Sequence, residues 1–252
     1  MTAEAGLPRS IGRAPVRTVV SWSGGKDSAL ALHTLFMDPS VDVTGLLTTV
    51  THEYDRISMH GVRTALLSDQ AASLGLKLYT ARIPAGCSND QYESVMRAAL
   101  GRLRDDGVEA VAFGDLFLAD VRAYRERLMS DTGICPVFPL WGRSTPALAR
   151  QFIEAGFRAV LACVDPRQVD VSHCGCDFDQ ALLDALSPTA DPCGENGEFH
   201  TFVYDGPMFE WPIEPQRGEI VQRDGFAFCD LLPRDAARAT SGDAARGGMT
   251  CA

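Results

Sequence analysis

The chain has 252 residues and a formal net charge of −10, and hydrophobic residues make up 46% of it. This composition predicts a folded globular protein with room for one large domain and a smaller lobe. No apolar run approaches the roughly 20 residues that span a bilayer, and no signal-peptide pattern opens the chain, so we expect a cytoplasmic protein without membrane contact. The acidic balance disfavours nucleic acid as the main partner, because phosphate backbones bind basic surfaces.

Hydrophobic periodicity divides the first two thirds of the chain into alternating strands and helices. The predicted strands are Thr18–Trp22, Val43–Val50, Leu78–Ile83, Ala110–Phe113, Val137–Pro139 and Arg158–Val164, and the predicted helices are Asp27–Phe36, Val62–Leu74, Asn89–Arg104 (capped by Asn89 or Asp90), Asp120–Ser130 and Pro146–Ala155. Repeated strand–helix units of this length form parallel sheets with right-handed crossovers. The pattern therefore predicts an α/β fold with a doubly wound parallel sheet.

Beyond Asp165 the pattern changes to short strands separated by clusters of Gly, Pro and Asp, with strands predicted at Glu198–Tyr204, Glu219–Arg223 and Gly225–Leu231. This change predicts a smaller C-terminal α+β lobe. We expect a flexible leader over 1–14, the sheet domain over 15–140, the smaller lobe over 141–232 and a flexible tail over 233–252.

The first predicted strand runs directly into the hexapeptide Ser23-Gly24-Gly25-Lys26-Asp27-Ser28, after which a helix begins. Two glycines permit a tight turn that brings backbone N–H groups close to a phosphate, and the helix start adds a positive dipole end. The spacing excludes a Walker A loop. The hexapeptide resembles the PP-loop of ATP pyrophosphatases, adenine nucleotide α-hydrolase-like enzymes that cleave ATP between the α and β phosphates. The alternative is a helix capped by Ser23 or Asp27 after a tight turn.

Three further stretches extend this resemblance: Arg56–Arg63, Gly114–Glu126 with Pro136–Trp141 after it, and Cys193–Pro207. Together with the hexapeptide they resemble the diphthine–ammonia ligase family, in its bacterial branch. The resemblance implies that ATP activates a carboxylate as an acyl-adenylate and that ammonia displaces AMP to leave an amide. Most archaeal and eukaryotic members carry Glu-Gly-Gly-Glu-Tyr-Glu-Thr where this chain has Glu-Asn-Gly-Glu-Phe-His-Thr at 195–201. The carboxylate acceptor, small or protein-borne, is therefore left open.

Adenylation requires neutralised phosphates, for which we expect Lys26 and a Mg²⁺ ion held by Asp27 and Asp115. Plainer roles are a helix-start charge for Asp27 and a loop cap for Asp115. Glu195 and Glu198 stand three residues apart in a glycine-bearing loop, so both are expected to point into one pocket, where they bind ammonium or accept a proton. Solvated glutamates in a polar hairpin are the alternative.

Other nucleotide contacts are expected from His60 and Gly114. In an open parallel sheet the loops that follow strands meet at one edge, so residues 23–28, 48–56 and 114–120 are expected to converge. One cluster contains side chains that can bind a metal, namely His173, Cys174, Cys176 and Cys193. Its Cys-x-Cys gap is short and a second ligand pair is missing, which disfavours a metal site there.

The expected nitrogen source is free ammonium, unless a partner subunit delivers ammonia, because no glutaminase domain is evident. A homodimer is left open. Two alternative functions remain: a PP-loop enzyme that modifies RNA, and a non-catalytic ATP-binding module. Retention of both Lys26 and Asp27 favours catalysis over the second of these.

Overall fold

The structure is a computed structural model, and it describes residues 14–51, 56–57 and 61–234. Nearly all of the expected leader, the tail beyond Arg234, and His60 lie outside these residues. Among the described helices, none combines the length and the apolarity that a bilayer crossing requires.

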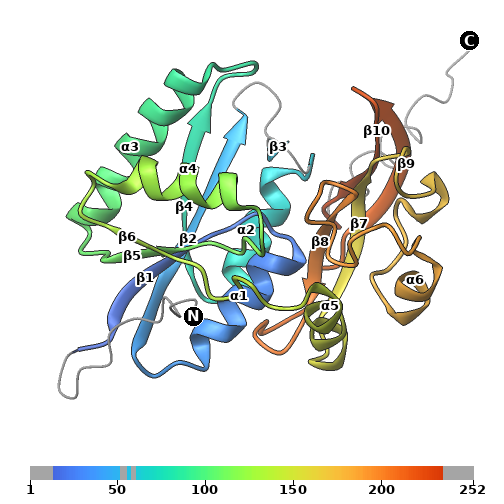
Figure 1. Ribbon diagram of the computed structural model, residues 1–252, viewed down its shortest axis with the longest axis horizontal. Coiled ribbons are helices and arrows are strands. Elements are labelled where there is room, and N and C mark those ends of the chain that lie inside the picture. Colours follow the sequence, from blue (N-terminus) through green and yellow to red (C-terminus); the bar gives the residue numbers. More distant parts are fainter. Residues whose placement is uncertain (1–13, 52–55, 58–60, 235–252) are drawn as a thin grey trace, which may run out of the picture.

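Five parallel strands form the core of the first sheet, in the spatial order β4-β2-β1-β5-β6. Their bounds are β1 Val16–Ser21, β2 Val41–Thr51, β4 Lys77–Ile83, β5 Ala110–Ala112 and β6 Cys135–Val137. The two-residue strand β3, Arg56–Ile57, pairs antiparallel with the end of β2. Figure 1 shows this sheet on the left, in blue to green.

Helices cover both faces of this sheet, because consecutive strand residues point to opposite sides. Val20 packs with α1 (Lys26–Phe36) and α2 (Thr64–Ser73), whereas Val19 packs with α3 (Asn89–Asp105) and α4 (Ala119–Met129). The predicted doubly wound α/β fold is thus confirmed.

The start of α3 differs from the prediction. Its N-cap is Ser88 rather than Asn89 or Asp90. The Ser88 hydroxyl accepts a hydrogen bond from the Gln91 N–H at 3.3 Å, and the Gln91 side chain accepts one from the Ser88 N–H at 2.9 Å. This reciprocal capping box satisfies two helix-end donors at once, which a lone Asn or Asp cap does not.

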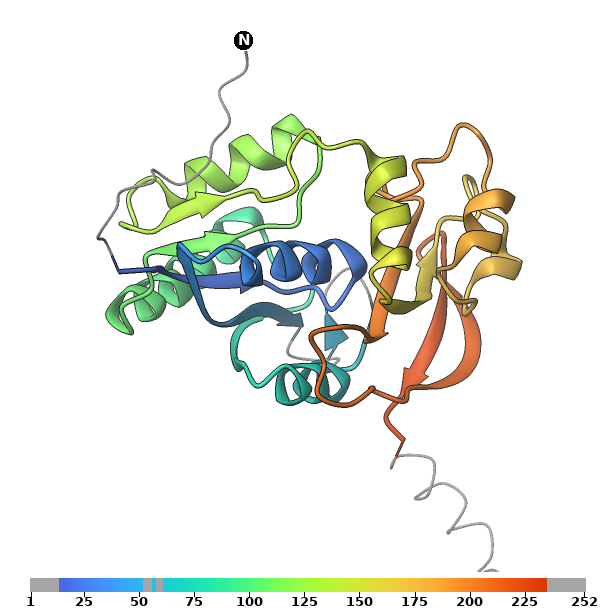
Figure 2. The same cartoon turned by 90° about the horizontal axis from the view of Figure 1, so that it is seen from below.

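A second, antiparallel sheet follows in the C-terminal part of the chain, in the order β8-β7-β10-β9. Its strands are β7 Arg158–Val164, β8 Phe199–Asp205, β9 Gln216–Arg223 and β10 Phe226–Leu232, and its helices are α5 Thr145–Glu154, the 3₁₀ turn η1 Val171–His173 and α6 Gln180–Ala185. The two sheets stand side by side in both views (Figures 1 and 2).

The placement of β7 corrects one prediction. The alternating pattern predicts that this strand belongs to the parallel sheet, but it pairs antiparallel with β8 and β10 instead. It is buried along nearly its whole length, and buried strands of parallel and antiparallel sheets look alike in sequence. Its pairing partners, which lie 35 to 65 residues later in the chain, decide which sheet it joins.

Candidate functional site

Residues 23–28 form the turn between β1 and α1, and two positions in it require glycine. Gly24 has a φ of +77°, and a Cβ there would lie 2.8 Å from Leu67 Cδ2 and 2.9 Å from Gln70 Oε1. A Cβ on Gly25 would lie 3.0 Å from the Thr201 carbonyl oxygen. The loop backbone is therefore pressed against its surroundings on both sides, as a backbone cradle requires.

The loop is fixed to β8 through a buried glutamine. The Gly24 carbonyl accepts hydrogen bonds from the Val203 N–H at 2.8 Å and from Gln70 Nε2 at 3.0 Å. Gln70 also donates to the Val203 carbonyl at 2.6 Å and accepts from Trp22 Nε1 at 2.8 Å. Gln70 is fully buried, so its amide joins β1, α2, the loop and β8 in one hydrogen-bonded unit.

Lys26 continues this anchoring with both its backbone and its side chain. Its N–H donates to Thr201 Oγ1 at 3.0 Å, and its buried ammonium donates to Asp27 Oδ2 at 2.8 Å and to the Cys193 carbonyl. Burial is the largest influence and lowers the pKa of Lys26, but Asp27, Cys193 and Asp191 together raise it above its usual value, so the ammonium stays charged. The Lys26 ammonium, which we expect to face phosphates, is thus held between Asp27 of the loop and the carbonyl of Cys193.

A cavity of about 470 Å³ opens over this loop, between the two sheets. Its walls contain most of the predicted site residues: Ser23, Gly25, Lys26, Asp27, Ser28, Gly114, Asp115 and Glu195. The loops at 23–28 and 114–120 converge there, as expected from the sheet topology. Gly24 and Glu198 are not part of the wall.

Gly114 explains how the second loop approaches the first. A Cβ on Gly114 would lie 2.8 Å from the carbonyl carbon of Asp27, so only glycine fits. The next residue, Asp115, accepts two hydrogen bonds from the Arg125 guanidinium, at 2.5 and 3.1 Å. Both carboxylates expected to hold a metal thus carry a cationic partner, Lys26 for Asp27 and Arg125 for Asp115.

Glu195 brings a carboxyl group with a shifted pKa into the cavity. Its Oε1 accepts hydrogen bonds from the N–H groups of Leu116 and Phe117, at 2.8 and 3.4 Å. Burial raises the pKa of Glu195 to about 7, and the nearby carboxylates of Asp27 and Asp115 act in the same direction. The group therefore changes its protonation state near neutral pH.

The expectation that Glu198 shares this pocket is wrong. Glu198 is 1% exposed and lies within the loop that carries Glu195. Its carboxylate accepts hydrogen bonds from the Asp191 N–H at 2.8 Å and from the Asn196 N–H and side-chain amide at 2.9 and 3.1 Å. The two glutamates diverge because these donors turn Glu198 inward, where it positions the loop.

His200 and Arg125 are cavity residues that the sequence did not single out. His200 is a residue of β8 and lines the cavity. Burial, with a smaller contribution from the Lys26 charge, lowers the pKa of His200 to about 4, so the imidazole is neutral at pH 7. The alternation of β8 shows that residues 199 and 200 face opposite sides, but not which side meets the loop.

The cysteines weighed as a metal cluster point to separate partners. The Cys174 thiol donates to the Ala227 carbonyl at 3.4 Å, and the Cys193 thiol donates to the Thr145 carbonyl at 3.3 Å. Burial raises the pKa of both thiols to about 12, which opposes the thiolate form that metals bind. In the described part of the chain, no group of three or more His, Cys, Asp or Glu is arranged to hold a metal.

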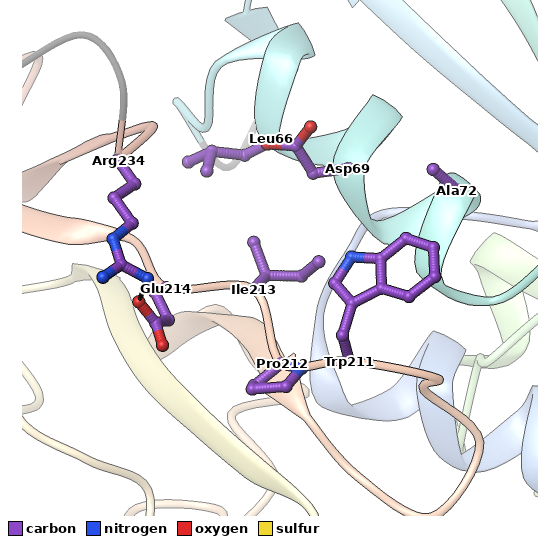
Figure 3. A pocket seen from close by; sticks show the side chains of 8 residues that line it. All are labelled: Leu66, Asp69, Ala72, Trp211, Pro212, Ile213, Glu214 and Arg234. Atoms are coloured by element: carbon purple, nitrogen blue, oxygen red, sulfur yellow. Dashed lines mark hydrogen bonds and ion pairs between the residues drawn. The ribbon is translucent and has the colours of Figure 1, made fainter.

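A separate hollow of about 420 Å³ lies between α2 and the segment after β8 (Figure 3). Trp211, which is 48% exposed, forms one side, and an ion pair between Glu214 and Arg234 lies at the other end. None of the predicted site residues lines this hollow.

Comparisons with known proteins divide the chain between the same two parts that carry the two sheets. Residues 16–136 match the family model described as the diphthamide synthase N-terminal domain, and residues 144–232 match the C-terminal domain of the same description. A mouse (Mus musculus) protein named diphthine–ammonia ligase is 26% identical over 188 residues, which are 73% of this chain and 70% of the mouse protein. The human (Homo sapiens) protein of that name is 25% identical over 238 residues, which are 86% of this chain and 89% of the human protein.

Similarity to solved structures is weaker. A predicted subunit of a tRNA methyltransferase from Methanocaldococcus jannaschii is 19% identical and has a TM-score of 0.39. The aligned part covers 57% of this chain and 80% of the methanococcal chain. A score this low carries no weight for either fold or function.

Proposed function

Because this chain belongs to the diphthamide synthase family, we propose that it is an ATP-dependent ligase that joins ammonia to a carboxylate. The relatives named diphthine–ammonia ligase cover this chain from its first sheet into its second. The proposal includes the finer reaction: the acceptor carboxylate attacks the α-phosphorus of ATP, pyrophosphate leaves, and ammonia then displaces AMP from the acyl carbon.

The loop at 23–28 supports the nucleotide half of this proposal. Gly25 and Gly114 let backbone segments pack closely around the loop, because a Cβ on either would press against the backbone of Thr201 or Asp27, and α1 begins at Lys26 with no side-chain cap from Gly25. The positive end of the helix dipole at this N-terminus suits an anionic phosphate. ATP supplies the adenylyl group that makes the carboxylate reactive and the pyrophosphate that leaves.

Asp27 and Asp115 are the residues that would hold Mg²⁺. Both line the cavity, and one or two carboxylates together with phosphate oxygens are the usual ligands of this ion. Since Lys26 and Arg125 already pair with them, metal binding would replace these cations at the carboxylates. The freed Lys26 and Arg125 charges would then be available to anionic substrate groups.

Glu195 supports the second half of the reaction. A carboxyl group with a pKa of about 7 is partly ionised at neutral pH, so it can hold an ammonium ion and accept the proton that nitrogen loses as it attacks. The observation that carries the proposal is that Glu195 and the loop at 23–28, called the nucleotide loop below, line the same cavity of about 470 Å³.

A product assay tests the proposal. The full chain is incubated with ATP, Mg²⁺, ammonium and a panel of carboxylates that includes a diphthine-bearing protein, and pyrophosphate, AMP and ADP are measured. We expect AMP and pyrophosphate in equal amounts, no pyrophosphate from Lys26→Ala, and full activity from the exposed control Lys77→Ala. Formation of ADP, or full activity of Lys26→Ala, would contradict the proposed reaction.

A further inference from the structure

The open edge of the second sheet is formed by β9, which exposes two adjacent apolar side chains among its charged and polar ones. All eight residues of β9 are exposed, including the neighbouring Ile220 and Val221 at 48% and 51%. Both views place the β9–β10 hairpin on the side of the second sheet away from the first (Figures 1 and 2). Among the described residues, no strand pairs with the outer side of β9. Proteins normally shield such edges, because they recruit further strands.

The hairpin turn fixes which backbone groups face this open edge. Asp224 and Gly225 form a two-residue turn with φ values of 52° and 82°, and Arg223 is opposite Phe226. Residues that flank a two-residue hairpin turn exchange hydrogen bonds with each other, and the direction of the backbone groups alternates along the strand. The N–H and C=O groups of Ile220 and Gln222 therefore point outward.

We propose that β9 pairs antiparallel with β9 of a second copy of this chain, about a two-fold axis at Val221. In this register Ile220 is opposite Gln222 of the second copy, so the outward backbone groups meet as hydrogen-bonded pairs. Val221 meets Val221 on the axis. Glu219 is opposite Arg223 of the second copy, and symmetry repeats that contact.

Charge selects both the occupant and the register. Directly opposite side chains of an antiparallel pair lie close enough to interact, and opposite charges there favour pairing. The register shifted by two residues in one direction opposes Arg217 to Arg223, and the shift in the other direction opposes Val221 to Arg223. Of these three registers, only the proposed one places Glu219 and Arg223 each opposite a residue of opposite charge. The strand is therefore complementary to a second copy of itself. Arg223 also lies 3.7 Å from Asp224, but both side chains are more than half exposed, so that pair holds Arg223 weakly.

The pairing also removes the hazard that the edge presents. A two-fold contact is closed, because each copy uses its one open β9 edge and no further copy can add there. The two antiparallel sheets become one continuous sheet, and Ile220 and Val221 gain neighbours across the junction. Since Phe226 of the adjoining strand lines the cavity, the junction lies one strand away from the candidate active site.

Sedimentation velocity of the full chain over a concentration series tests the proposal. We expect the wild type to form dimers, and Glu219→Arg and Arg223→Glu each to weaken association about tenfold, because each places like charges opposite one another twice. The double variant Glu219→Arg/Arg223→Glu restores opposite charges and should restore the dimer. Glu154→Arg, an exposed charge reversal on α5, is the matched control and should leave association unchanged. Thermal unfolding of each variant shows whether it is folded.

A backbone variant gives an independent readout. Gln222→Pro removes an outward N–H while leaving the donors that face β10, so it should abolish the dimer of a folded protein. A wild type that is monomeric up to its solubility limit, or that dimerises only after removal of residues 235–252, would overturn the proposal. A dimer that survives both single charge reversals, or that the double variant fails to restore, would do the same.

Discussion

Replacement of Gln70 by leucine should uncouple the nucleotide loop from β8 without leaving a hole. Leucine has nearly the volume of glutamine but offers no hydrogen bond, so the Trp22 N–H and the Val203 carbonyl each lose a buried partner, whereas the Gly24 carbonyl keeps its bond from the Val203 N–H. An unsatisfied buried polar group costs about 1–3 kcal/mol, so two cost about 2–6 kcal/mol, and the more apolar side chain offsets part of this. We expect Gln70→Leu to lower the free energy of unfolding by roughly 2–3 kcal/mol.

Urea denaturation followed by Trp fluorescence measures this loss, and equilibrium dialysis of ATP measures the effect on the loop. The matched control is Gln180→Leu, the same substitution at an exposed site with one hydrogen bond to Asp184, where a change within about 0.5 kcal/mol is expected. ATP affinity should fall in Gln70→Leu alone. If Gln70→Leu were as stable as the control variant, the assignment of Gln70 as the joint between loop and β8 would be refuted.

Three further predictions concern the cavity and the turn after β7. Glu195→Gln should retain ATP binding but lose activity by a factor of about 10²–10⁴, and the rise of wild-type kcat/KM with pH through about 7 should vanish in the variant. The folded protein holds the Glu195 proton up to about pH 7, whereas the unfolded chain releases it at lower pH. Wild-type stability should therefore fall from pH 5 to 7 more than that of the variant. Thr201→Val should weaken ATP binding because the Lys26 N–H loses its acceptor, and Thr201→Ser should restore it, as isothermal titration would show. The Arg167 guanidinium holds the pKa of Asp165 well below its usual range, so Asp165→Asn should destabilise the protein by about 1–3 kcal/mol at pH 7. The difference should shrink below about pH 4, where unfolded Asp165 becomes protonated, and a difference independent of pH would contradict the ion pair.

The strand–turn–helix conformation around residues 23–28 could be predicted from the sequence because it is determined locally. Gly24 and Gly25 follow a strand and precede a helix, and that order alone places a backbone turn with a helix start behind it. The sheet topology then brings Gly114 and Asp115 to the same edge, since loops that follow parallel strands converge. Long periodic helices such as α3 were likewise predictable, although its cap depends on the side chains of Ser88 and Gln91.

The features that were not predictable depend on contacts between distant segments. Glu195 and Glu198 look equivalent in the sequence, and only the N–H groups of Asp191 and Asn196 turn one of them inward. His200 lies on a strand whose two faces are distinguished by what packs on them. The sheet to which β7 belongs was similarly set by strands made later, because its own residues suit either kind of sheet.

The seat of the nucleotide loop on β8 has a consequence for biosynthesis. Residues 16–137 contain every strand of the first sheet, so this sheet can form while the rest of the chain is still on the ribosome. The Gly24 carbonyl, however, finds its partner in the Val203 N–H, and the Lys26 N–H finds its partner in the Thr201 hydroxyl. A nascent chain therefore carries the complete loop sequence well before the strand that holds the loop has been made, and we expect firm nucleotide binding only after β8 has emerged from the ribosome.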